Sequence, residues 1–112
     1  MTSSDLTGLA VIVERGKANN VVDAAKEAGA TGATVLQGRG TATEEILKLF
    51  TIRVNSLKEI VLIIGENDSL EKVLEHIAEK LKLREPGTGI AFTFPINKIV
   101  GLEYQKQANE EK

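Results

Sequence analysis

Residues 86–95 read Pro-Gly-Thr-Gly-Ile-Ala-Phe-Thr-Phe-Pro, and they join a glycine-rich turn directly to an apolar strand. Apolar side chains recur at every second position of residues 90–94, which predicts a strand with one apolar face. Glycine permits positive φ and brings the main chain close to a ligand. Successive N–H groups in such a turn form a concave nest for anions, so Gly87, Thr88 and Gly89 are candidates for phosphate binding. A plain tight turn is the alternative interpretation of these residues.

The segment before this turn has the clearest helical pattern in the chain. One face of the predicted helix is apolar, with the 3.6-residue period of an amphipathic helix, and consists of Leu70, Val73, Leu74, Ile77 and Leu81. Residues 68–71 read Asp-Ser-Leu-Glu and resemble a capping box, in which an oxygen caps the first turn and the glutamate reaches back. The sequence therefore predicts a helix that begins near Asp68.

The first half of the chain repeats the order of strand, helix and strand. Residues 9–13 (LAVIV) and 34–36 (TVL) are short β-rich runs. Between them, Asn19 or Asn20 is a candidate N-cap, because an asparagine side chain accepts from free N–H groups of the first turn. Gly29 is the candidate C-terminal stop of this helix.

The middle of the chain is less regular. Gly38, Arg39 and Gly40 form a second glycine-flanked segment, which is expected to be a turn that opens a flexible loop. Its arginine can make bidentate contacts to phosphate or carboxylate, although a hairpin turn with a solvated arginine is equally open. Residues 50–54 alternate as a strand does, while 46–50 also fit a short helix, and 59–64 predict a further buried strand.

This order of elements gives two β-α-β halves. It predicts an α+β, ferredoxin-like split β-α-β fold (βαββαβ), with an antiparallel sheet and two helices on one face. The predicted domain spans residues 8–102 with a loop at about 38–55, between a flexible N-terminus (1–7) and a polar tail (103–112). Because no further helix is available for the second face of the sheet, another copy of the chain is the expected cover, which predicts a homo-oligomer.

Composition and charge exclude several classes of function. The net charge is −2, aromatic residues are 4% and tryptophan is absent, which argues against nucleic-acid binding. The absence of cysteine excludes disulfides, thiolate catalysis and zinc–sulfur sites. Because the longest apolar run is only residues 60–64 and the start does not resemble a signal peptide, we expect a cytoplasmic protein that is not embedded in a membrane.

The sequence predicts no catalytic residue and no metal site. Its single histidine, His76, lies off the apolar face of the second helix and is expected to be a solvated surface residue. No HExxH motif, Ser/His/Asp spacing or Cys/His cluster occurs. The chain is therefore not expected to be an enzyme.

Three segments together resemble the PII signal-transduction family, also called nitrogen regulatory PII proteins. They are residues 27–35, 57–61 and 87–95, and the resemblance covers about residues 9–102. The last segment is the most specific, since it is similar to the family's B-loop and following strand, usually written Gly-Asp-Gly-Lys-Ile-Phe-Val-x-Pro.

The resemblance implies a homotrimer that binds an adenine nucleotide or a related small effector in the clefts between subunits. It implies that a long T-loop reports the bound state to a partner, often an ammonium transporter or an enzyme of nitrogen metabolism. Carried over by position, Thr34 would face the base and Gly87, Thr88 and Gly89 the phosphates. Gly38, Arg39 and Gly40 would lie at the root of the T-loop.

The sequence also departs from the family pattern. Ile90 replaces the B-loop lysine, Thr88 replaces its acidic residue, and residues 100–102 replace the C-terminal Arg-x-Arg. Each lost charge-assisted contact to a triphosphate costs about 1.5–3 kcal/mol, which argues against ATP binding of the usual family kind. The T-loop candidate, 38–55, contains no tyrosine, so nucleotidylation of a tyrosine there is not expected.

Two other classes of function stay open at this point. A structural trimer of the CutA type would share the fold without needing either glycine segment for binding. A ferredoxin-like enzyme acting on a small molecule is disfavoured, because the sequence shows no acid/base cluster.

Overall fold

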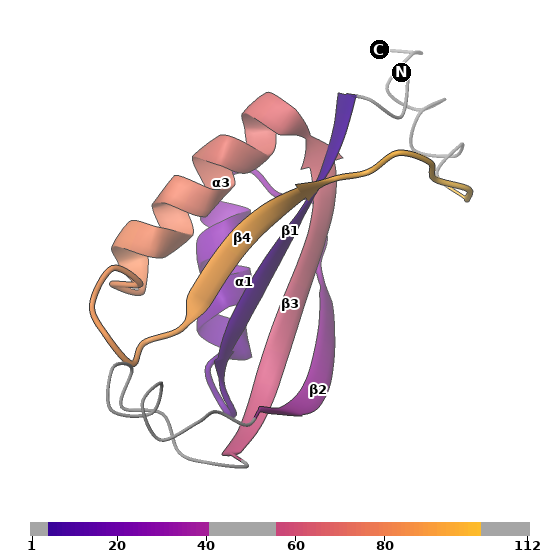
Figure 1. Ribbon diagram of the computed structural model, residues 1–112. Helices are drawn as coiled ribbons and strands as arrows, with labels where there is room; N and C mark the ends of the chain where they lie inside the picture. Colours follow the sequence, from indigo (N-terminus) through magenta and orange to yellow (C-terminus); the bar gives the residue numbers. More distant parts are fainter. Residues whose placement is uncertain (1–4, 41–55, 102–112) are drawn as a thin grey trace.

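The computed structural model describes residues 5–40 and 56–101. These residues form a four-stranded antiparallel sheet in the order β2-β3-β1-β4, and both helices pack on the same face of it (Figure 1). The elements are β1 (Leu6–Glu14), α1 (Ala18–Glu27), β2 (Thr34–Gly40), β3 (Ser56–Glu66), α3 (Asn67–Lys80) and β4 (Ile90–Pro95). The predicted ferredoxin-like βαββαβ fold is confirmed.

The core lies between the sheet and the two helices. Leu9, Val11 and Val13 of β1 are fully buried, because alternate side chains of a strand point to the same face. They pack with β3 and with the inner faces of both helices through Val61, Ile63, Val21, Ala24, Ala25, Leu70, Val73 and Ile77. The predicted apolar face of the second helix is thus confirmed as part of the core.

The first strand begins earlier than the sequence indicated. Leu6 and Thr7, which were expected to belong to a flexible N-terminal segment, pair with Glu66 and Gly65 of β3. Leu6 is buried, and the Thr7 hydroxyl lies 3.0 Å from Asn67 Oδ1, to which it donates a hydrogen bond. The folded part of the chain therefore begins before residue 8.

The glycine segment at 38–40 is part of a strand and not a turn. Gly38, Arg39 and Gly40 pair with Lys58, Leu57 and Ser56 of β3. The prediction of a turn here is wrong, because pairing with the long strand β3 extends β2 through both glycines. The remainder of the predicted loop, the predicted strand at 50–54 and the polar tail at 103–112 lie outside the described residues.

Helix α1 takes its N-terminal cap from a distant residue. Neither Asn19 nor Asn20 caps it, since both lie inside the helix. Instead, Glu59 of β3 accepts hydrogen bonds through Oε1 from the main-chain N–H groups of Gly16 (2.7 Å) and Ala18 (3.0 Å). These bonds, from Ala18 first and then Gly16, lower the pKa of Glu59 below its usual value.

The other helix ends follow simple rules. Gly29 stops α1 as predicted, with φ of 102°, and the N–H groups of Gly29 and Ala30 donate to the carbonyls of Lys26 and Ala25 in a Schellman motif. The capping box expected at Asp68 is not formed, because β3 runs directly into α3 and the helix begins at Asn67 without a side-chain cap.

The second face of the sheet is apolar and open. Phe92, Phe94, Ile90 and Ile64 lie on it and are 38–50% exposed. They share this face because Gly8, Ala10 and Ile12 pair with Phe94, Phe92 and Ile90 across the β1–β4 ladder. Within the described ranges, neither helix is long and apolar enough to span a membrane.

We expect Glu59→Gln to destabilise the protein at neutral pH, because the amide keeps an acceptor but loses the charge that favours the N-terminus of α1. A carboxylate with a lowered pKa stabilises the fold above its unfolded pKa of about 4.3, and this stability is lost as the pH falls through the lower folded pKa. The urea midpoints of wild type and variant, followed by circular dichroism, should therefore differ more at pH 7 than at pH 3.

Glu71→Gln is the matched control, since Glu71 is exposed on α3 and the substitution removes the same charge. Its midpoint should remain close to that of the wild type at both pH values. Equal midpoints for Glu59→Gln and the control at pH 7 would contradict the role of Glu59.

Candidate functional site

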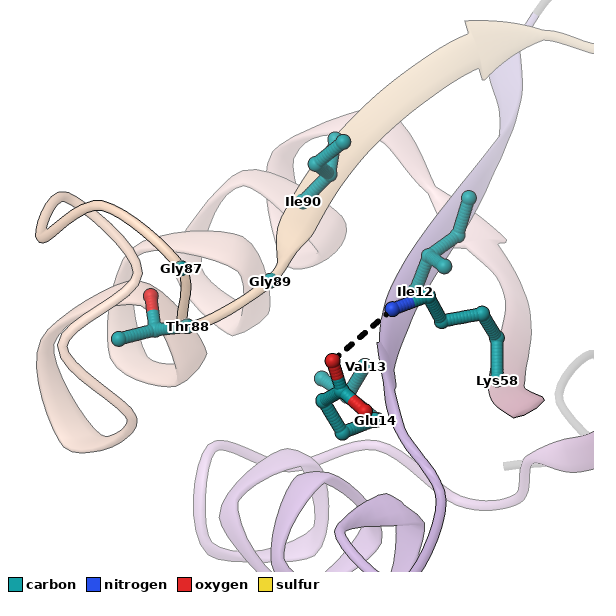
Figure 2. A pocket seen from close by; sticks show the side chains of 8 residues that line it. All are labelled: Ile12, Val13, Glu14, Lys58, Gly87, Thr88, Gly89 and Ile90. Atoms are coloured by element: carbon teal, nitrogen blue, oxygen red, sulfur yellow. Dashed lines mark hydrogen bonds and ion pairs between the residues drawn. The ribbon is translucent and has the colours of Figure 1, made fainter. Parts of the chain in front are cut away.

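The Gly87–Gly89 turn packs against the end of β1 and encloses a small cavity there (Figure 2). The cavity has a volume of about 70 Å³ and is lined by Ile12, Val13, Glu14, Lys58, Gly87, Thr88, Gly89 and Ile90. Small-molecule pockets usually measure about 300–1,000 Å³. This cavity alone is therefore too small to hold a nucleotide.

Gly89 is required by the fold of the turn itself. Its φ is 147°, a conformation that L-residues with a side chain rarely adopt. A Cβ at this position would lie 2.9 Å from the main-chain oxygen of Ile12 and 3.0 Å from Cγ1 of Val13. The turn thus approaches β1 so closely that only glycine fits at Gly89.

The Thr88 side chain is used within its own loop. Its hydroxyl lies 3.0 Å from the carbonyl oxygen of Lys82 and 2.9 Å from that of Glu85, and it donates to these oxygens. The bonds tie the loop after α3 to the turn. Because the hydroxyl of Thr88 is occupied by these bonds, the predicted contact between Thr88 and a ligand would be made by the main-chain N–H of Thr88.

The charged side chains that line the cavity are Lys58 and Glu14. Lys58 Nζ lies 3.0 Å from Glu14 Oε1, and the two residues are direct partners in the β1–β3 ladder (Figure 2). The Lys58 side chain is 12% exposed and that of Glu14 is 41% exposed. Sequence reasoning did not single out this pair, because only the strand register brings residues 44 positions apart into contact.

The other predicted site residues lie on the far edge of the sheet. Thr34 and Gly38 are in β2 on the open face of the sheet, where they pair with Leu62 and Lys58. Arg39 is the next residue after Gly38 and therefore lies on the opposite face, which the helices cover. Strands β2 and β4 are separated by β3 and β1, about 14 Å at the usual strand spacing. A single chain therefore does not bring Thr34 and Arg39 together with the Gly87–Gly89 turn.

His76 has a partner on the helical layer, away from the cavity. Its Nε2 lies 2.8 Å from Glu27 Oε1, and Lys80 Nζ lies 3.8 Å from the same oxygen. The hydrogen bond with His76, followed by the charge of Lys80, lowers the pKa of Glu27. His76 thus links α3 to α1. The sequence predicted that His76 is a solvated surface residue, but it did not predict this contact with Glu27.

Metal ligands do not gather in the part of the chain that the structure describes. Across residues 5–40 and 56–101, no three His, Asp or Glu side chains form a group that would hold an ion. The candidate site therefore rests on the turn, the Lys58–Glu14 pair and the apolar walls.

Comparison with known proteins places this ferredoxin-like α+β chain among signal-transduction proteins. The family model for nitrogen regulatory protein P-II matches residues 6–106, and the chain belongs to this family. No curated protein sequence matches the chain.

Two solved structures show the same fold. The crystal structure of Arabidopsis thaliana PII bound to citrate is similar with a TM-score of 0.67 and 23% identity, over 89% of this chain and 82% of that one. The structure of the B. subtilis GlnK–ATP complex is similar with a TM-score of 0.62 and 17% identity, over 92% of this chain and 91% of that one.

We expect Gly89→Ala to cost more stability than alanine at two other glycines. At Gly89 both the positive φ and the contact with Ile12 oppose a side chain. Gly16 has φ of 94° but open space around it, and Gly32 has open space without a positive φ. Thermal unfolding should rank the losses as Gly89→Ala, then Gly16→Ala at about 1 kcal/mol, then Gly32→Ala near zero.

The difference between the first two variants measures the close approach of the turn to β1. A Gly89→Ala variant as stable as Gly32→Ala would show that the turn does not hold the position described here. Because Gly89 is needed for the fold, its substitution is not a clean test of ligand binding.

Proposed function

We propose that this P-II family member is a regulatory protein that binds a small effector beside the Gly87–Gly89 turn. The observation that carries the proposal is the position of the turn, which meets the end of β1 at a cavity that also contains Lys58. Main-chain N–H groups and a lysine are the groups that proteins use to hold phosphate or carboxylate. The small volume of this cavity supports a site that a second subunit would complete.

The effector is an adenine-nucleotide-type or another small anionic ligand. Relatives of the same fold are described bound to citrate and to ATP, which supports this class. Ile90 lines the cavity with an apolar side chain where the family has a lysine, so fewer charge-assisted contacts are available for a triphosphate. We therefore propose a ligand with less negative charge than ATP.

The site is formed between subunits of a homotrimer. The apolar face that carries Phe92, Phe94 and Ile64 needs a cover, and a second copy of the chain would supply it. Such packing would bring Thr34, Gly38 and Arg39 of one subunit to the turn of another. Within one chain these groups lie on opposite edges of the sheet.

The regulatory step is a population shift. Effector binding would change the preferred conformation of the segment that follows β2, and a partner protein would bind one of the two states. A transporter or an enzyme of nitrogen metabolism in the cytoplasm is the proposed partner. The protein itself would carry out no chemical reaction and bind no nucleic acid.

Calorimetry of the purified protein tests the effector. Titrations with ATP, ADP, AMP, cyclic nucleotides, 2-oxoglutarate and citrate should show saturable binding of at least one of them. If nucleotides bind, we expect a lower dissociation constant for AMP than for ATP. If none of these ligands binds, the proposed effector site is contradicted, and the alternative of a structural trimer of the CutA type is favoured.

Light scattering tests the trimer. Phe92→Glu would place a charge in the proposed subunit interface, where burial of an unpaired charge is costly, so we expect it to dissociate the wild-type trimer. Asn20→Glu on the exposed side of α1 is the control and should leave the trimer intact. A monomeric wild type would rule out a site between subunits.

A further inference from the structure

The candidate cavity contains two opposite charges that cancel each other. Lys58 and Glu14 are 3.0 Å apart and directly opposite in the sheet, so their pairing follows from the strand register. Gly38, the partner of Lys58 on β2, has no side chain to offer. Among the described residues, the carboxylate that neutralises Lys58 is thus that of Glu14.

The side chains of Lys58 and Glu14 differ in how far they are exposed to solvent. The Lys58 side chain is 12% exposed, so its stem is confined, whereas the Glu14 side chain is 41% exposed and has access to water. Glu14 can therefore leave the pair at a smaller cost than Lys58, because its carboxylate can be hydrated. An anion that reaches the turn and binds the Lys58 ammonium therefore competes with the Glu14 carboxylate for this cation.

We propose that Glu14 is a specificity-determining residue of this site. It competes with an anionic ligand for Lys58 and, once displaced, repels the ligand's remaining charges. The site then favours ligands with one anionic group, a carboxylate or a phosphate monoester, over polyphosphates. This inference rests on the proposed function, because it requires that the cavity binds an anion.

The test compares two nucleotides of different charge. Glu14→Gln should increase the affinity for ATP by about two- to fivefold, the range that a partly exposed ion pair supports, and that for AMP by a smaller factor. The measured quantity is the ratio of the ATP and AMP dissociation constants, obtained by calorimetry. A purely structural role of Glu14 would not change this ratio.

Three further variants make the result specific. Glu14→Asp retains the carboxylate and should retain a ratio near that of the wild type, while Glu71→Gln removes the same charge from α3 and should not change it. In the Glu14→Gln, Lys58→Gln double variant, the gain for ATP should fall below that of Glu14→Gln alone, because the competed cation is absent. Circular dichroism verifies that each variant is folded.

The outcomes separate the two proposals. Binding by Glu14→Gln but not by the wild type would support the competition, as would a lower ratio of the ATP to the AMP dissociation constant. An unchanged or higher ratio in a folded Glu14→Gln protein that binds both nucleotides would overturn the role of Glu14 and leave the effector site intact. If neither the wild type nor Glu14→Gln binds any anion, the effector site itself is overturned.

Discussion

The structure depends on the register of the central strand β1. This strand pairs with β3 on one side and with β4 on the other, and each pairing fixes which side chains share a face. The register sends Leu9, Val11 and Val13 into the core beneath the helices. A slip by one residue would expose these side chains and bury the opposite set.

The same register creates the candidate site. It places Glu14 opposite Lys58, and it brings Ile12 opposite Ile90, so that the preceding turn lies against the end of β1. Gly89 permits this approach because a side chain would collide with the main chain of Ile12. Core packing, the turn and the charged pair are therefore consequences of one alignment. The cap on α1 follows from it as well, since Glu59 reaches Gly16 and Ala18 from the helix face of β3.

The exposed apolar face of the sheet and the small size of the cavity have the same explanation if a second subunit packs on this chain. Phe92 and Phe94 are large side chains left half exposed, and the cavity is too small for a nucleotide. The predicted residues of β2 lie at the opposite edge from the turn. A subunit interface would cover the face and complete the site together, which is why the proposed trimer and the proposed effector site belong to one hypothesis.

The amino-acid sequence by itself determined the order of elements, the apolar face of α3 and the stop of α1 at Gly29, because periodicity and glycine geometry are local properties. It also identified the Gly87–Gly89 turn and the family. It did not predict the strand at Gly38–Gly40, the cap from Glu59 or the Lys58–Glu14 pair. These depend on contacts between residues more than forty positions apart or on pairing with a long neighbouring strand, and only the tertiary structure fixes such contacts.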